Sequence, residues 1–285
     1  MERPLEITSG IAGFATRTPT PPPATHTNSY ALGERDVLLV EPATPYEEEQ
    51  RAFIEWARGL ADAGRRVVAI FLTHHHPDHV GGARLFAREL GFPLWAHRST
   101  AERLPKIAID RLLEDGESLT LAGPSTQRWT VLHTPGHAPG HLCLHEPSLG
   151  YLVAGDMVAS EGTILIDPDD GDMGTYLAQL ERLRGLGVRV ALPAHGAPIE
   201  QPDGLFAYYI HHREAREARI VQVLATAAPR GDTIDEIVAR AYDDKPKSVW
   251  PLARLSTAAH LAKLVREGRV RQRDDRYALA MEGAT

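Results

Sequence analysis

Residues 74–79 read His-His-His-Pro-Asp-His, which places four imidazoles and one carboxylate in six consecutive positions. Alternate residues of an extended chain point to the same side, so His74, His76 and Asp78 are expected to face one point while His75 faces away. Neutral imidazoles and a carboxylate that converge in this way match a zinc or iron site. The segment therefore predicts a metal site, and an incidental polar loop is the alternative interpretation.

Three later stretches each place one histidine or aspartate at the end of an expected strand. The stretches are Thr134–His137, Ala154–Asp156 and Leu192–Gly196, and the residues that they offer are His137, Asp156 and His195. Strand ends are rigid positions, and one edge of a sheet can bring several of them together. A lone Gly-Asp pair is typical of a turn, but all of these pieces in this order favour a single metal centre.

Together these residues resemble the five-motif signature of the metallo-β-lactamase superfamily, over roughly residues 25–200. The resemblance implies an α/β fold, an αββα sandwich whose cleft along the sheet edges holds two metal ions. It also implies the ligands: His74, His76 and His137 for one metal, Asp78, His79 and His195 for the second, and Asp156 as the bridge between them. None of these residues departs from the signature.

Further motifs resemble the lactamase-β-like protein 2 group of that superfamily, in which a C-terminal winged helix follows the metal-binding domain. They are Thr27–Tyr30, Glu161–Thr163, His212-Arg213 and Arg216-Glu217. The group includes a mitochondrial single-strand endoribonuclease and bacterial hydrolases of unassigned substrate. Two positions depart from it: Glu41-Pro42 replaces the usual Asp-Thr after a strand, and His26 replaces a common glycine. The first change affects the groups that support the metal ligands, and the second adds an imidazole near the cleft.

The expected elements suit that fold. Strands are expected at residues 37–40, 67–72, 93–97, 129–133, 141–145, 151–154 and 188–192. Helices are expected at 46–63, at 83–90, and from an N-cap at Asp172 to about Arg184. Some strands follow one another as hairpins while others are separated by helices, so mixed sheets covered by helices are predicted. The proline-rich segment Thr18–Ala24 is interpreted as a rigid surface loop and not as a linker.

The chain changes character near residue 205. Residues 1–205 are assigned to the catalytic domain, and residues 206–285 to a helical connection and a small winged-helix domain. Helices are expected at 208–228, 234–242 and 252–267, with Thr233 capping the second and Gly268 ending the third, and a hairpin follows at 269–279. Three helices followed by a hairpin are the layout of a winged helix.

Basic residues of this tail raise the question of nucleic acid. Arg269, Arg271 and Arg273 alternate along the hairpin, and a basic strand can contact phosphates. Residues 205–285 nevertheless carry a net charge of only +3, whereas residues 1–204 carry −10. Binding of single-stranded RNA therefore stays open beside two other roles for the winged helix, which are assembly of a homodimer and service as a lid.

The expected chemistry is hydrolysis. Two divalent ions roughly 3.5–4 Å apart polarise a substrate oxygen and lower the pKa of a bridging water towards 7. The metal-bridging hydroxide then attacks a carbonyl or phosphorus centre, and Asp78 is the candidate catalytic residue because it can orient that hydroxide. Two zinc ions are expected, although the same ligands accept iron or manganese. Cys143 is expected in a buried strand and not as a nucleophile.

Other polar residues are given an expected role according to their position relative to the candidate metal ligands. Candidates for contact with the ligands or the substrate are His141, Asn28, His26 and His212. Histidines interpreted as packing or structural residues are His75, His133 and His145. The acidic run at 167–172 is interpreted as a turn that caps the next helix.

A small ester, thioester or lactone is the favoured substrate, and metal-dependent cleavage of single-stranded RNA is the alternative. A β-lactam ranks lower, because lactamases of the superfamily generally have Cys or Ser where this chain has Asp156. A non-enzymatic regulator that binds nucleic acid also ranks lower. A structural zinc needs four ligands and leaves no open position, whereas seven candidate ligands are present.

Composition limits the class of protein further. The 285 residues are 43% hydrophobic and 24% charged, as in globular proteins with a full core. No apolar run is long enough to span a bilayer, and the first residues lack the basic and apolar regions of a signal peptide. A cytoplasmic protein with a small-molecule substrate and no membrane partner is therefore expected.

Overall fold

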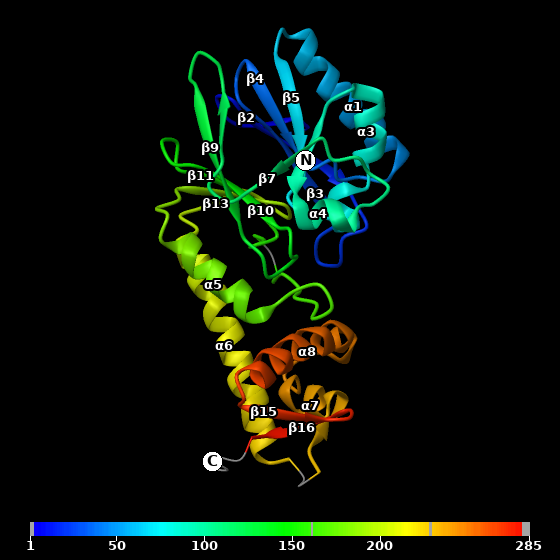
Figure 1. Ribbon diagram of the computed structural model, residues 1–285, viewed down its shortest axis with the longest axis vertical. Coiled ribbons are helices and arrows are strands. Elements are labelled where there is room, and N and C mark those ends of the chain that lie inside the picture. The colour runs from blue at the N-terminus through cyan, green and yellow to red at the C-terminus, as the bar shows by residue number, and fades with distance from the viewer. Residues whose placement is uncertain (1–2, 161, 228–229, 281–285) are drawn as a thin grey trace.

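The structure is a computed structural model that describes residues 3–160, 162–227 and 230–280, and Figure 1 shows the arrangement of its elements. Two mixed sheets make up the amino-terminal part. The first has the strand order β1 to β7, at Leu5–Thr8, Ile11–Arg17, His26–Leu32, Asp36–Val40, Arg66–Phe71, Leu94–His97 and Arg111–Leu113. The second has the order β13-β12-β11-β10-β9-β8, at Ile199–Glu200, Val190–Pro193, Tyr151–Gly155, Leu142–Glu146, Gln127–His133 and Ser118–Leu121.

The two sheets pack face to face and are covered by helices on their outer faces. The cluster buried between the sheets takes side chains from both, among them Leu38, Val40, Trp129 and Val153. The outer face of the first sheet is covered by α1 (Glu47–Asp62) and α3 (Ala83–Leu90). Phe53 of α1 stacks on Phe86 of α3 with 4.3 Å between ring centroids, so these helices bury one shared aromatic layer.

The second sheet is covered by α5 (Met173–Arg184) and α6 (Asp203–Ala225). Tyr176 of α5 and Phe206 of α6 are fully buried against this sheet. Asp172 caps α5, as predicted, because its carboxylate accepts the backbone N–H of Thr175 at 2.7 Å. The layers are therefore helix, sheet, sheet and helix, which confirms the predicted αββα fold class.

Several strands end at the same edge of this sandwich. β5 ends at Phe71, β9 at His133, β11 at Gly155 and β12 at Pro193. Strands β11 and β12 run parallel with Gly155 opposite Pro193, so the loops that follow them leave the sheet side by side. The candidate metal ligands lie in the segments that follow these four strand ends.

Beyond the sandwich, α6 continues into a small carboxy-terminal domain (Figure 1). Its helical elements are α7 (Ile234–Ala241), the 3-10 turn Lys247–Val249, and α8 (Trp250–Arg266). Its sheet has the order β14-β16-β15, at Asp232–Thr233, Arg276–Leu279 and Val270–Arg273. Thr233 caps α7 in a capping box with Glu236, as the sequence predicts for the cap. Helices followed by a hairpin confirm the predicted winged helix.

Some elements differ from expectation. Helix α6 begins at Asp203 and not at Tyr208, so the division expected at residue 205 falls inside this helix. The expected helix end at Ala228 lies outside the described residues. The elements β1, β2 and α4 (Arg98–Arg103) were not expected, because these segments have no clear period of apolar residues. Within the described part of the chain, no helix has the length and apolar character required to cross a membrane.

Candidate metal centre

The candidate ligands converge at one edge of the sandwich. His74 and His76 follow β5, Asp78 and His79 lie in the short helix α2 (Pro77–Val80), His137 follows β9, Asp156 follows β11, and His195 follows β12. The alternation expected for an extended segment ends at His76, because Pro77 begins α2 ahead of the helix that was expected at 83–90. Asp78 and His79 therefore reach the centre from a helical turn.

One group of ring nitrogens is formed by His74, His76 and His137. Nε2 of His74 lies 2.9 Å from Nδ1 of His76 and 3.2 Å from Nε2 of His137. His74 and His137 are buried, and His76 is partly exposed. Three nitrogens this close together form a set that a single cation could share.

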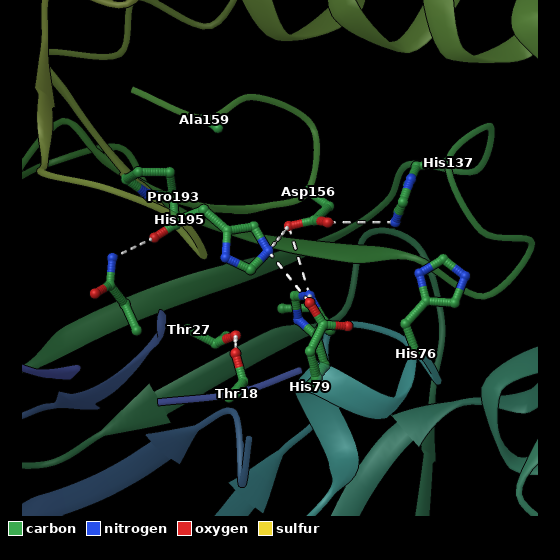
Figure 2. Close-up of polar contacts among 12 residues, drawn as sticks. Thr18, Thr27, His76, His79, His137, Asp156, Ala159, Pro193 and His195 are labelled. Atoms are coloured by element: carbon green, nitrogen blue, oxygen red, sulfur yellow. Dashed lines mark hydrogen bonds and ion pairs between the residues drawn. The ribbon is translucent and has the colours of Figure 1, made fainter. Parts of the chain in front are cut away.

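Asp156 lies between this group and a second one, as Figure 2 shows. Its Oδ2 is 3.4 Å from Nε2 of His137. Its Oδ1 is 3.3 Å from Nε2 of His195 and 3.6 Å from Nε2 of His79. Asp78 completes the second group, with its Oδ2 at 3.6 Å from Nε2 of His195. One carboxylate therefore faces both groups and directs one oxygen to each.

Three of the imidazoles are fixed by a hydrogen bond on the ring nitrogen that points away from the centre. The contacts are His79 Nδ1 to Glu41 Oε2 at 3.0 Å, His137 Nδ1 to the Leu165 carbonyl at 2.9 Å, and His195 Nδ1 to the His26 carbonyl at 2.9 Å. A donor role for Nδ1 leaves the lone pair of Nε2 directed towards the centre. These contacts therefore present the rings in the tautomer that binds a metal.

The residues present fit a metal ion. Nε2 of His79 and Oδ1 of Asp156 are buried and have no hydrogen-bond partner among the described residues, although they lie 3.6 Å apart. An unsatisfied buried polar group costs about 1–3 kcal/mol, and a shared cation would satisfy both atoms. Imidazole nitrogens and carboxylate oxygens suit zinc, iron and manganese alike.

Burial and neighbouring charges act on these groups in opposite directions. Burial lowers the pKa of His137 to about 4. Burial also acts against protonation of His79, but the carboxylates of Asp156 and Asp78 outweigh it and raise the pKa of His79 well above its ordinary value. Although burial opposes ionisation of Asp156, the imidazoles of His195 and His79 hold its pKa well below its ordinary value. Without metal, the second group is therefore an ion-paired cluster that must release protons to bind a cation.

His141 supports Asp156. Its ring is fully buried, its Nε2 accepts the backbone N–H of Asp156 at 3.0 Å, and its Nδ1 contacts the Thr134 hydroxyl at 2.8 Å. Gly155 has φ 51°, and a Cβ at this position would lie 2.5 Å from Nε2 of His141. A glycine is therefore needed for this close approach, and His141 sets the position of the bridging carboxylate through its backbone.

Asn28 and His26 act on the segment that carries His195. The Asn28 amide donates to the carbonyl of Pro193 at 3.0 Å, on the segment that leads to His195. His26 contacts His195 through its carbonyl, while its exposed ring is hydrogen-bonded to Thr25 at 2.8 Å. The additional imidazole expected near the cleft therefore does not line it, because the ring is held by its neighbour in the chain.

His212 and Cys143 lie apart from the centre. His212, on α6, packs near Tyr208 with 6.0 Å between ring centroids and does not line the cleft. Cys143 is fully buried in β10, as predicted, and burial raises the pKa of its thiol to about 12. A thiol in this state is not a nucleophile at neutral pH.

Asp170 is a site residue that was not expected from the sequence. The expected turn is present, because the carbonyl of Asp167 accepts the N–H of Asp170 at 3.2 Å. The Asp170 carboxylate also contacts Nε2 of His76 at 3.0 Å and Nε2 of His75 at 3.2 Å. His75 was expected to face away from His76, but both rings reach the same carboxylate. No local sequence signal connects an aspartate with a histidine 94 positions away.

The centre opens into a cleft of about 440 Å³. Candidate ligands line it together with the loop 19–24, the segment 163–165 and Leu252 of α8. The proline-rich loop, which was expected at the surface, therefore also forms one wall of the cleft.

A helix-covered double sheet with paired histidine and aspartate groups at its edge is typical of a metal-dependent hydrolase. Residues 22–195 match the metallo-beta-lactamase superfamily, and residues 233–278 match the beta-lactamase associated winged helix domain. The chain therefore belongs to the metallo-beta-lactamase superfamily, which confirms the resemblance found in the sequence and makes it a metal-dependent hydrolase.

Relatives resemble the chain over most of its length. It is 29% identical over 256 residues to the beta-lactamase-like protein 2 homolog of Drosophila melanogaster, in a match that covers 86% of this chain and 84% of the relative. It is 32% identical to the lactamase-like protein vrtG of Penicillium aethiopicum, over 63% of this chain and 57% of the relative. A solved metallo-beta-lactamase family protein from Thermus thermophilus is 26% identical with a TM-score of 0.76, over 95% of this chain and 98% of that one. A beta-lactamase domain protein from Burkholderia ambifaria has the same fold, with a TM-score of 0.81 at 21% identity over 97% and 93% of the two chains.

Proposed function

We propose that this protein is a binuclear hydrolase that holds two zinc ions and cleaves a small ester, thioester or lactone. The observation that carries the proposal is the position of Asp156. Its two oxygens face separate groups of ligands, 3.4 Å from His137 on one side and 3.3 Å from His195 on the other. A carboxylate in this position suits a bridge between two cations, and the buried unpartnered atoms beside it support metal binding.

Two bound ions would supply a water nucleophile that is active near neutral pH and a Lewis acid for the oxygen of the substrate. The residues of the chain position that chemistry. Asp78 lines the cleft beside His195, where its carboxylate can accept a hydrogen bond from the attacking water and orient it. Among the described residues that line the cleft there is no serine, cysteine or lysine, so an attack by water agrees with the side chains available.

The charge of the cleft favours an uncharged small substrate. Its lining, within the described residues, has no lysine or arginine, and Asp167 adds a further carboxylate. In the tail, Arg269 pairs with Glu217 at 3.0 Å and Arg276 pairs with Glu236 at 3.1 Å. Phosphates of a polyanion bind most strongly to cations that are not already paired.

Metal-dependent cleavage of single-stranded RNA is the second candidate. Arg271 and Arg273 are exposed on β15, where they could contact a phosphate backbone. The acidic cleft argues against this function, although two bound metal ions would offset several negative charges. We rank it below hydrolysis of a small substrate for that reason.

Side-by-side assays on p-nitrophenyl acetate, a lactone, bis-(p-nitrophenyl) phosphate and labelled single-stranded RNA test the proposal. We expect about two ions per chain, and ester or lactone turnover that is lost on chelation and restored by zinc. Asp78→Asn should lower kcat by about 10²-fold or more, whereas Asp203→Asn, at an exposed position of α6, should not. Full activity in metal-free protein would contradict the proposal, and RNA cleavage without ester turnover would favour the second candidate.

A further inference from the structure

One wall of the cleft is built from apolar side chains. They come from Pro19 and the prolines 21–23 of the loop between β2 and β3, from Ile164 and Leu165 after β11, and from Leu252 of α8. The candidate ligands, two threonines and Asp167 supply the polar part of the lining. A small number of polar groups on an otherwise apolar cleft is typical of a site for a small molecule with a hydrocarbon part.

Leu252 brings the winged-helix domain into this wall. Among the described residues that line the cleft, it alone comes from the carboxy-terminal domain. The residue is 39% exposed and lies in the first turn of α8. The helix is fixed to the catalytic part, because Arg213 of α6 donates to Oγ of Ser256 at 3.3 Å and Arg266 pairs with Asp172. An exposed leucine is ordinary by itself, but this one is held in position beside the metal centre.

The proline-rich loop is a rigid partner for Leu252. Each proline fixes its own φ, so the loop has few conformations to lose. Its base is closed by the Thr18 N–H, which donates to the Thr25 carbonyl at 3.3 Å. A second contact joins the hydroxyls of Thr18 and Thr27 at 2.8 Å (Figure 2). A wall that is formed before binding adds little entropic cost to the capture of a ligand.

The charges of the side chains near this wall favour an uncharged arm over an anionic one. Two arginines contact residues beside the cleft, and neither is among the described residues that line it. Nε of Arg103 contacts Asp170 at 2.9 Å, and buried Arg213 donates to the carbonyl of Ile164. Asp167 in the lining would repel a carboxylate or phosphate. A cleft of about 440 Å³ has room for a small molecule and not for a folded partner.

We propose that Leu252 and the loop 19–24 form a subsite for the hydrocarbon part of an uncharged acyl substrate, so that the winged helix takes part in substrate selection. The identity of the reacting group rests on the proposed function, whereas binding of the hydrocarbon arm does not require turnover. Each methylene that becomes buried should raise binding by up to about fourfold. The subsite therefore predicts a preference for longer acyl chains until the wall is covered.

Two measurements test this subsite in the metal-loaded protein. In the first, kcat/KM for p-nitrophenyl hexanoate should exceed that for the acetate by about tenfold or more. Leu252→Ala should reduce this ratio about fivefold, and Leu252→Met should restore it. Val249→Ala is the matched control, because Val249 is also 39% exposed, lies just before α8 and does not line the cleft.

The second measurement follows binding of hexanamide and acetamide by calorimetry. Hexanamide should bind more tightly, with a negative heat-capacity change, and Leu252→Ala should weaken it several-fold. This result would support the subsite even if no ester is hydrolysed. Failure of the subsite can therefore be distinguished from failure of the proposed function. Equal rates for both esters together with equal binding of both amides would overturn the subsite, as would equal losses in Leu252→Ala and Val249→Ala.

Discussion

Nδ1 of His79 donates a hydrogen bond to Oε2 of Glu41 at 3.0 Å, and both side chains are buried. The other oxygen of this carboxylate accepts the backbone N–H of Thr73 at 2.8 Å. The backbone of Glu41 has φ 60°, a conformation that is strained for a residue with a side chain. Glu41 therefore connects the end of β4 to the ligand-bearing segment and fixes the ring of His79. Glu41 stands where the lactamase-β-like protein 2 group usually has aspartate. The replacement therefore keeps a carboxylate at this position, and that carboxylate supports the candidate metal ligand His79.

Replacing Glu41 with glutamine should weaken binding of one metal ion by about 10–100-fold. A glutamine accepts through a single oxygen, so either His79 or the N–H of Thr73 would face an amide donor. Competition with a chelator, followed by metal analysis, should show that one of two ions is lost first. Glu48→Gln, at an exposed position of α1, should keep both. Unchanged affinity for both ions in Glu41→Gln would contradict this role.

Asp170→Asn should lower both metal affinity and kcat/KM by about tenfold. The carboxylate accepts from Nε2 of His76 at 3.0 Å, which directs Nδ1 towards the centre and increases the basicity of the ring. A neutral amide keeps the shape but loses the charge. Asp169→Asn is the control, because Asp169 is an exposed neighbour in the same turn. Identical metal affinity and activity in the two variants would exclude a role for Asp170 in orienting His76.

Arg213→Met should destabilise the protein by about 1–3 kcal/mol and loosen the His137 side of the centre. The buried guanidinium donates to the carbonyl of Ile164, and the next carbonyl, of Leu165, holds His137 at 2.9 Å. Urea denaturation and metal analysis would measure the two effects. Arg219→Met, on the same helix, removes an exposed ion pair with Asp243 and a long exposed hydrogen bond to the carbonyl of Arg240, and should cost less than about 1 kcal/mol. If the two variants match in stability and metal content, Arg213 does not couple the tail to the centre.

The sandwich and the convergence of the candidate ligands could be predicted from the sequence for a physical reason. Ligands must be particular residue types, and strand ends bring them to a shared edge, so residues 74–79 and the three later motifs carry a local signal. Helix caps are local in the same sense, which is why Asp172 and Thr233 were identified as caps.

The contact partners of the residues that support the ligands could not be predicted in this way. Glu41 contacts His79, which lies 38 positions away in the sequence, and Arg213 contacts Ile164, which lies 49 positions away. Such contacts depend on how the layers pack, and neither residue has a neighbour or a period that indicates its partner. The role of His26 shows the same limit. It acts through its backbone carbonyl, and because every residue has a carbonyl, the residue type does not indicate this role.

Glu217 of α6 contacts three cationic or titratable side chains of the winged-helix domain. Its carboxylate accepts from Nζ of Lys263 at 2.9 Å and from a guanidinium nitrogen of Arg269 at 3.0 Å, and it contacts Nδ1 of His260 at 3.4 Å. Burial opposes its ionisation, but His260 and Lys263 outweigh burial and lower the pKa of Glu217 to about 2, from an ordinary 4.5. The ionised form is therefore the form that stabilises the fold.

The stability that Glu217 contributes should depend on pH with a definite sign. Because its pKa is lower in the folded state, the contribution is complete above the unfolded value of 4.5 and is lost as the pH falls towards about 2. Urea denaturation from pH 7 to pH 3 should show Glu217→Gln less stable than the wild type at neutral pH, on the order of 1–2 kcal/mol after allowance for solvent screening. The difference should shrink steadily below pH 4.5, since the unfolded wild type then binds a proton at Glu217 that it must release on folding. Glu214→Gln, on the exposed face of the same helix, should follow the wild type throughout. A difference between wild type and Glu217→Gln that stays constant down to pH 3 would mean that packing, and not charge, explains the effect.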